Sequence, residues 1–262
     1  MTTAPHDPTD STPAKVAAVT LGFWIAKVAA TTLGETGGDW VTMSLALGYL
    51  VGTAIFAAVF VVLVAAQVRA SRFHPFLYWA TIVATTTLGT TMADFFDRSL
   101  GVGYPGGAAI IGGLLVASLG VWHRVEGSVS IGSITTPRAE WFYWCTILLS
   151  QTLGTALGDW SADDDGGGLG LGFEHAALLF GGLLLVIAAL YFWTRLSRTL
   201  LFWLAFVLTR PLGATVGDLL DKPTAQGGLQ LDRLHASLAL LAFMVACVVL
   251  FPQRAARSGL GG

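Results

Sequence analysis

The sequence is poor in charged residues. Lys, Arg, Asp and Glu together make up only 11% of its 262 residues, and 54% are hydrophobic. A soluble domain carries about 25% charged residues, so this chain lacks the charge to cover a water-facing surface. A formal net charge of -2 also provides no basic surface for nucleic acid. The composition therefore excludes a soluble enzyme, a disordered regulator and a nucleic-acid binder, and it predicts a membrane protein whose main partner is the lipid bilayer.

Cysteines and catalytic motifs are also scarce. The two cysteines, Cys145 and Cys247, both lie in apolar segments, so the sequence contains neither a disulfide framework nor a zinc motif. It has no nucleophile elbow, phosphate-binding loop or metalloprotease helix. We therefore expect no enzymatic activity and no cofactor.

Long segments with few charges predict eight membrane-spanning helices. The stretch between Asp39 and Arg69, for example, contains no charged residue, and about 20 apolar residues are enough to cross a bilayer. The predicted helices lie near residues 17–38, 44–67, 76–94, 104–122, 141–158, 175–194, 199–217 and 234–252. Nine basic residues lie before the first helix or follow the even-numbered helices, whereas Arg98, Lys222 and Arg233 lie on the other side. The positive-inside rule then places both termini in the cytoplasm.

The four odd-numbered helices carry an internal repeat. Each repeat begins with Trp, has Leu-Gly nine and ten residues later, and ends with Asp fifteen residues after the Trp: Trp24–Asp39, Trp79–Asp94, Trp144–Asp159 and Trp203–Asp218. A repeat of two helices preserves orientation, so the sequence predicts an all-α bundle of four parallel two-helix repeats. We expect one membrane domain, 15–253, with repeats 15–68, 69–126, 134–196 and 197–253. A disordered cytoplasmic tail, 1–14, and a second cytoplasmic tail, 254–262, would flank it.

The segments Thr31–Asp39 (TTLGETGGD) and Ser150–Asp159 (SQTLGTALGD) carry a resemblance to a known family. They resemble a bacterial family of uncharacterised integral membrane proteins built from four tandem two-helix repeats of unknown function. The resemblance covers roughly residues 17–252, and it implies this fold and a location in the bacterial inner membrane. It implies no activity. The fourth repeat departs from the pattern, because Arg210-Pro211 replaces the Thr-Thr or Gln-Thr pair of the others.

The repeated aspartates are the first candidate site. A carboxylate at the carboxyl end of a helix is electrostatically unfavourable, and four such carboxylates invite a compensating cation. The candidate ligands for a hard divalent ion are Asp39, Asp94, Asp159 and Asp218. The alternative is that each aspartate only caps the following segment or is solvated in a loop.

A second polar group is predicted one turn deeper, on one face of the odd-numbered helices. Its members are Lys27, Thr31, Glu35, Thr86, Gln151 and Arg210. Ionisable residues at membrane depth usually face a protein interior or a cavity. Three interpretations stay open: a structural ion pair between Glu35 and Arg210, a proton or cation relay through Glu35 and the aspartates, and an anion site around Lys27 and Arg210.

Two further repeated features have simpler interpretations. The tryptophans are expected to anchor the helices in the lipid headgroup zone. Small residues four apart, such as Gly34 and Gly38, are expected to let the odd-numbered helices pack closely around a shared axis.

These observations favour a transporter or exporter of a small cation. Its partner would be a small ion or solute. A divalent metal would be its substrate rather than a resident cofactor, and proton coupling and a homo-oligomer are open options. The alternatives are a pseudo-fourfold ion channel and a non-transporting structural or sensory membrane protein.

Overall fold

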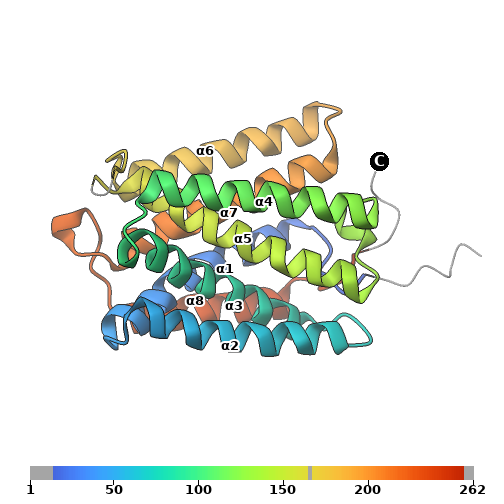
Figure 1. Ribbon diagram of the computed structural model, residues 1–262, viewed down its shortest axis with the longest axis horizontal. Coiled ribbons are helices and arrows are strands. Elements are labelled where there is room, and N and C mark those ends of the chain that lie inside the picture. The colour runs from blue at the N-terminus through green and yellow to red at the C-terminus, as the bar shows by residue number, and fades with distance from the viewer. Residues whose placement is uncertain (1–13, 165–166, 257–262) are drawn as a thin grey trace, which may run out of the picture.

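Eight α-helices make up the fold of the computed structural model, which describes residues 14–164 and 167–256 (Figure 1). The helices are α1 (Leu21–Asp39), α2 (Gly48–Arg69), α3 (Pro75–Asp94), α4 (Tyr104–Glu126), α5 (Pro137–Ala162), α6 (Gly172–Trp193), α7 (Arg198–Asp221) and α8 (Arg233–Leu250). Short π-helical turns, Trp40–Ser44 and Phe95–Ser99, continue α1 and α3, and the turns Ile131–Ser133 and Thr224–Gln226 are 3-10 helical. The predicted all-α bundle is confirmed. Residues 1–13 and 257–262 of the two predicted tails lie outside the described residues.

Local sequence signals set the helix ends. The side chains of Thr20, Thr136, Ser197 and Asp232 each accept a hydrogen bond from the backbone N–H three residues on. This satisfies one of the donors that a helix leaves unpaired at its amino end. Pro75 and Pro137 occupy first helical positions, where the missing N–H costs no bond. Gly127 ends α4 with a φ of 75°, a conformation that glycine adopts without strain.

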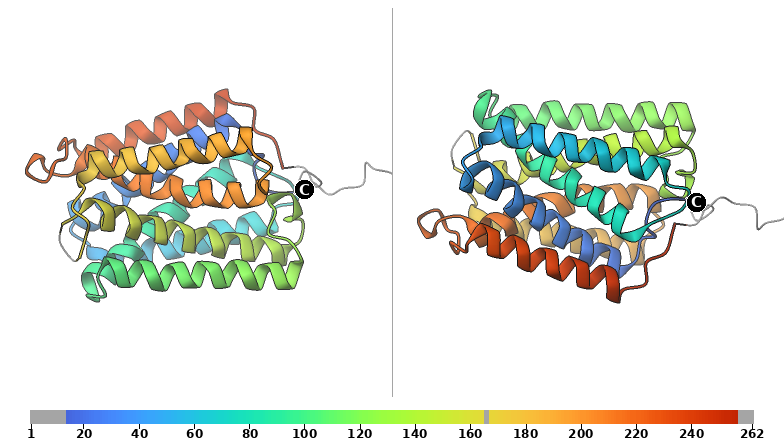
Figure 2. Two further views of the ribbon diagram at one scale, coloured as in Figure 1. Left: turned by 90° about the horizontal axis from the view of Figure 1, so that it is seen from above. Right: turned by 90° about the horizontal axis from the view of Figure 1, so that it is seen from below.

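The odd-numbered helices form an inner ring. α1 packs against α3, α3 against α5, α5 against α7, and α7 against α1, so the ring closes. The even-numbered helices lie outside it, and each packs on the inner helix of the next repeat: α2 on α3, α4 on α5, α6 on α7, and α8 on α1 (Figure 2). The repeats are therefore interlocked rather than stacked as independent hairpins.

Glycines allow the inner helices to approach closely, as predicted. The glycine ten residues after each repeat tryptophan faces the next helix of the ring: Gly34 faces Thr86, Gly89 faces Gln151, Gly154 faces Arg210 and Gly213 faces Thr31. A Cβ atom at Gly89 would lie only 2.8 Å from the Cβ of Gln151. Because backbone packing replaces the hydrophobic effect between membrane helices, these contacts hold the ring together.

Five helices are long and apolar enough to cross a membrane: α2, α4, α6, α7 and α8. The other three, α1, α3 and α5, belong to the inner ring. Their threonines and all their charged residues except Arg138, near the start of α5, are buried by neighbouring helices, so these helices need not be apolar on every side. The composition of the inner ring thus follows from its place in the bundle.

Three of the four repeat tryptophans are buried, so the interpretation as headgroup anchors is wrong for them. Trp79, Trp144 and Trp203 are only 1%, 0% and 6% exposed. Trp79 and Trp144 both pack against Tyr78, and Tyr78 shares a hydrogen bond with Tyr143. Packing against other aromatic rings stabilises these side chains inside the bundle instead of at its lipid surface.

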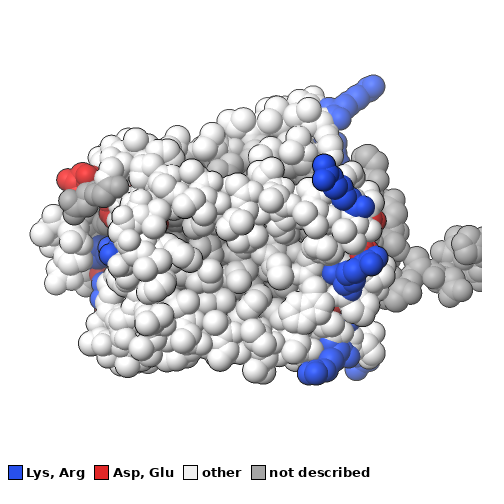
Figure 3. Space-filling view, in the orientation of Figure 1, with Lys and Arg blue, Asp and Glu red and all other residues white. Residues whose placement is uncertain are grey.

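Charge separates the two ends of the bundle. On the face shown in Figure 3, most of the Lys and Arg side chains gather at one end, and the surface between the two ends is almost free of charge. We call this the basic end. The first inner helix begins there, and the segments before α1 and after α8 meet there through an antiparallel bridge between Ala17 and Ala255. The opposite end, where the four repeat aspartates lie, is called the acidic end.

Candidate functional site

The ring encloses layers of polar side chains. The residues seven positions after each tryptophan are Thr31, Thr86, Gln151 and Arg210, and all four are fully buried. The residues eleven positions after each tryptophan are Glu35, Thr90, Thr155 and Ala214, which are at most 2% exposed. The repeat aspartates form the next layer, at the acidic end. Every polar candidate from the sequence therefore lies inside the ring or at its acidic end.

Arg210 and Glu35 form an ion pair inside the ring. A guanidinium nitrogen of Arg210 lies 2.7 Å from Glu35 Oε2. The same nitrogen donates to the hydroxyls of Thr90 and Thr155. Arg210 is 0% exposed and Glu35 is 2% exposed. Burying one charge alone would cost several kcal/mol, so each member of the pair depends on the other.

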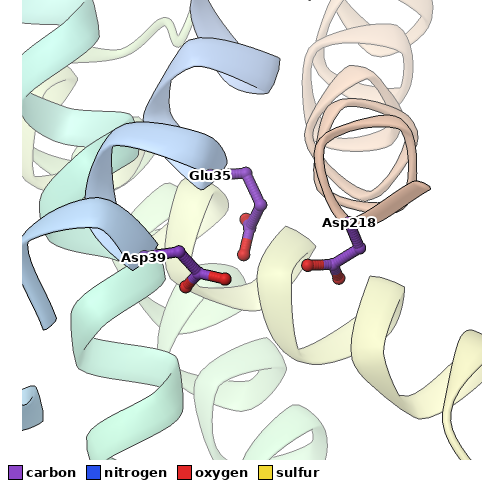
Figure 4. Close-up of side chains that lie close together, drawn as sticks. All are labelled: Glu35, Asp39 and Asp218. Carbon is purple, nitrogen blue, oxygen red and sulfur yellow. The ribbon is translucent and has the colours of Figure 1, made fainter. Parts of the chain in front are cut away.

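Three carboxylates converge at the acidic end of the ring. Oxygens of Glu35, Asp39 and Asp218 all lie within 4.8 Å of one another, and all three side chains are buried. Glu35 and Asp39 come from α1, Asp218 comes from α7, and the three carboxylates point toward one another (Figure 4). We call these residues the Glu35 cluster. Oxygen ligands of this kind suit a hard cation. Asp39 Oδ1 is buried and has no hydrogen-bond partner among the described residues.

The side chain of Lys222 reaches into the Glu35 cluster. Its ammonium lies 2.5 Å from Asp39 Oδ2 and 3.1 Å from Asp218 Oδ1. Lys222 directly follows α7 and is 7% exposed. Burial opposes its charge, but the carboxylates of Asp218 and Asp39 outweigh this effect and raise the pKa of Lys222 well above its usual value. The cluster therefore already holds a cation that the chain itself supplies.

The other two repeat aspartates meet a different cation. Arg98 lies 2.9 Å from Asp94 Oδ1 and 3.8 Å from Asp159 Oδ2. It also lies 3.5 Å from Asp163, which accepts a hydrogen bond from the hydroxyl of Tyr104. The four aspartates are thus arranged as two cation-bridged pairs rather than as one group of four.

Lys27 lies deeper in the ring, in a layer of apolar side chains. Its ammonium is 3.5 Å from Gln151 Oε1 and 3.5 Å from Thr209 Oγ1, and it lies 4.2 Å from the centre of the Phe206 ring. Lys27 is fully buried. Among the described residues Lys27 forms no ion pair with Glu35, which is paired with Arg210 instead. The Lys27 side chain therefore occupies the interior of the ring at this depth.

The repeat pattern shared by all four units does not predict the bridging cations, Arg98 and Lys222. The pattern Asp-x-x-Asp-basic occurs in the second repeat, Asp94 to Arg98, and in the fourth, Asp218 to Lys222. The first and third repeats lack it and have Trp directly after the aspartate. This alternation was the available signal. It relates the first repeat to the third and the second to the fourth, which is the twofold arrangement of the bridged pairs.

Comparison with known proteins identifies the repeat. The profile of the family described as Repeat of Unknown Function (DUF347) matches residues 22–73, 77–128, 142–197 and 201–252. No curated protein and no solved structure matches the chain significantly. Because the four matches cover most of the membrane bundle, the chain belongs to the Repeat of Unknown Function (DUF347) family.

Proposed function

We propose that this protein is a membrane transporter or exporter of a small cation, and that the Glu35 cluster is its binding site. The observation that carries the proposal is the convergence of three buried carboxylates within 4.8 Å, in a chain with only 11% charged residues. Buried acids in a membrane protein are costly and commonly bind or relay ions. Asp39 Oδ1 has no hydrogen-bond partner within residues 14–164 and 167–256, so this oxygen is a candidate for a further ligand bond.

The position of the cluster favours transport over simple binding. It lies at the acidic end of the ring, and the threonine, glutamine and arginine layers continue from it toward the basic end. We infer that the basic end faces the cytoplasm of a bacterial inner membrane, because cytoplasmic segments are enriched in Lys and Arg. On this orientation the cation would meet the cluster from the outside.

A carrier is favoured over the pseudo-fourfold channel. The axis is occupied by the buried side chains of Arg210 and Lys27, both of which are 0% exposed. A buried guanidinium on this path opposes the rapid, unbroken movement of cations that a channel requires. We propose that the ion crosses together with a rearrangement of these side chains, with Glu35 as the candidate for proton exchange.

A structural role is the second candidate, and the ion pairs themselves favour it. Glu35–Arg210 and Asp39–Lys222 each join α1 to α7 or to the residue that follows it. Such pairs would fix the register of the ring without moving an ion. A flux measurement separates this role from transport.

The test is uptake of radiolabelled Mn²⁺ into proteoliposomes that contain the full chain, with and without a pH gradient. We expect saturable uptake that Asp39→Asn and Glu35→Gln reduce at least about tenfold, a loss worth about 1.4 kcal/mol in the rate-limiting step. Glu174→Gln is the matched control, because Glu174 is exposed on α6 at the acidic end. Equal flux in protein-containing and empty vesicles would support the structural role instead.

A further inference from the structure

The two cations that contact the Glu35 cluster, Arg210 and Lys222, are held in place in two different ways. Arg210 donates to Glu35, Thr90 and Thr155, so contacts with three inner helices fix its guanidinium. The Lys222 ammonium, by contrast, is bonded among the described residues to Asp39 and Asp218, which are both members of the cluster. One cation is part of the ring, and the other occupies the site.

Only the side chain of Lys222 needs to move for the site to be vacated. Its backbone N–H donates to Asp218 O at 2.9 Å, and its carbonyl accepts from Gln230 N at 3.0 Å. These bonds anchor the backbone at the end of α7. The flexible four-carbon side chain lies beyond that anchor, so the ammonium can leave the carboxylates without unfolding a helix.

The charge of the site changes when Lys222 leaves. The three carboxylates of the cluster and the two cations Arg210 and Lys222 give a net charge of about −1. Withdrawal of the ammonium leaves about −2. The neighbouring carboxylate of Asp221 does not change this difference, because it is paired with Arg233 at 3.2 Å.

We propose that the Lys222 ammonium is a tethered competitor for the cation site, and that the ion which displaces it is a divalent metal ion. This inference rests on the proposed function and names its substrate class. A divalent ion would neutralise the vacated cluster and find carboxylate oxygens as ligands, including Asp39 Oδ1, which no group in the described part of the chain hydrogen-bonds. A monovalent ion would only replace the single positive charge of Lys222 with another. It would also have to compete with an ammonium whose effective concentration is high because it is attached to the chain beside the site.

The Lys222 ammonium also affects the protein when no metal is bound. When no metal is bound, Lys222 neutralises part of a buried negative cluster whose members would otherwise repel one another. The binding of a metal is therefore an exchange of cations and not a filling of an unoccupied space. Removal of the Lys222 charge should tighten metal binding, even though it removes an ion pair from the fold.

The first experiment measures Mn²⁺ binding to the purified full chain in detergent by calorimetry, at constant pH and ionic strength. Lys222→Met should bind Mn²⁺ about tenfold or more tightly than the wild type. Lys222→Arg, which keeps the charge, should not gain affinity. Arg124→Met is the control for loss of one positive charge, since Arg124 is exposed at the basic end. Equal or weaker binding by Lys222→Met, an equal gain in Arg124→Met, or a gain for Na⁺ instead of Mn²⁺ would overturn the inference.

The second experiment uses the wild type and does not depend on a variant that folds. An amine-acylating reagent is applied with and without saturating Mn²⁺, and peptide mass spectrometry gives the labelling rate at Lys222. Displacement of the ammonium should raise this rate severalfold, whereas Lys27, which is 0% exposed, should stay unlabelled. An unchanged or lower rate at Lys222 while Mn²⁺ is bound would refute the displacement.

The two proposals fail in different ways. If Asp39→Asn binds and transports Mn²⁺ as the wild type does, the Glu35 cluster is not the site and the proposed function falls with it. If Mn²⁺ binding and flux depend on Asp39 but Lys222 is neither displaced nor inhibitory, the proposed function stands and only the tethered competitor is refuted.

Discussion

The two halves of the ring share one geometry and differ in charge. In one half Lys222 bridges Asp218 and Asp39, and in the other Arg98 bridges Asp94 and Asp159, although more loosely. The glycine contacts are equivalent all around the ring. The backbone scaffold is thus close to fourfold, while the bridging cations follow a twofold pattern.

Two positions remove even the twofold symmetry. Glu35 in the first repeat corresponds to Thr155 in the third. Arg210 in the fourth repeat corresponds to Thr86 in the second. A carboxylate and a guanidinium at these two positions are therefore present in one half only, whereas the third carboxylate near Arg98 in the other half is that of Asp163, which directly follows α5. The repeat thus supplies a common frame of close helix contacts, and the two halves differ in a few polar side chains inside it.

The largest expected effect comes from breaking the ion pair in the charged half. Arg210→Met should lower the free energy of unfolding by about 3–5 kcal/mol, because Glu35 is left buried without its partner. Thr86→Ala, at the equivalent place in the other half, should cost only about 1 kcal/mol, the loss of one hydrogen bond to Ala30. Denaturant unfolding in detergent, followed by circular dichroism, measures both.

A double variant sharpens this result. Adding Glu35→Gln to Arg210→Met should recover part of the loss, since the unpaired charge is removed. Equal costs for Arg210→Met and Thr86→Ala would show that the two halves do not differ in the way proposed.

The glycine contacts should show the opposite behaviour, with the two halves alike. Gly89→Ala and Gly213→Ala each place a methyl group within 3.0 Å of the next helix, so each should destabilise the bundle by about 1–3 kcal/mol. Gly120→Ala is the control: no atom lies within 4 Å of its added Cβ, and alanine favours a helix by about 1 kcal/mol over glycine. Thermal melting of the three variants provides the measurement, and a large difference between Gly89→Ala and Gly213→Ala would contradict a uniform frame.

A smaller effect is expected from Asp97, which lies in the π-helical turn after α3. Burial raises the pKa of Asp97 to about 6, although Arg98 opposes the shift. A raised pKa in the folded state means that the protonated form stabilises the fold. The stabilisation of the folded state by protonated Asp97 is fully present below pH about 4 and is lost as the pH rises through about 6.

Asp97→Asn should therefore melt several degrees above the wild type at pH 7 and close to it at pH 4. Melting curves across this pH range check the prediction. Asp164→Asn, a change at an exposed acid, should leave the pH profile unaltered. A wild-type profile that stays flat between pH 4 and pH 7 would contradict it.

The smallest effect should come from the start of α8, the outer helix that corresponds to α4. Asp232 accepts the backbone N–H of His235, and this bond lowers the pKa of Asp232. Its stabilising effect is present at neutral pH and fades as the pH falls below the usual value of about 4. At the start of α4 the corresponding N-cap residue is Gly103, which has no side chain to accept such a bond.

Asp232→Gly should leave α8 without a side-chain cap, as α4 is. The variant should melt at a lower temperature than the wild type at pH 7, and the two melting temperatures should differ less at pH 3. The change should be smaller than those expected for Arg210→Met, Gly89→Ala and Asp97→Asn. A loss that is just as large at pH 3 would show that the carboxylate charge plays no part.

The sequence predicted the helices well, because the bilayer imposes a length and an apolar composition that can be read directly. The predicted span 76–94 and the observed α3 (Pro75–Asp94) differ by one residue at the start. The first helix begins later than predicted, at Leu21, because Thr20 caps it. The Trp-to-Asp repeat also located the inner helices and the polar residues that line the ring.

The sequence alone did not decide which polar residues meet. Lys27 and Glu35 lie two turns apart on one helix, and both had plausible partners elsewhere. Only the closure of the ring, with α7 against α1, brings Arg210 to Glu35 and Lys222 to Asp39. Local periodicity specifies the face of a helix, but the choice of partner depends on which helices become neighbours, and that is a property of the folded bundle.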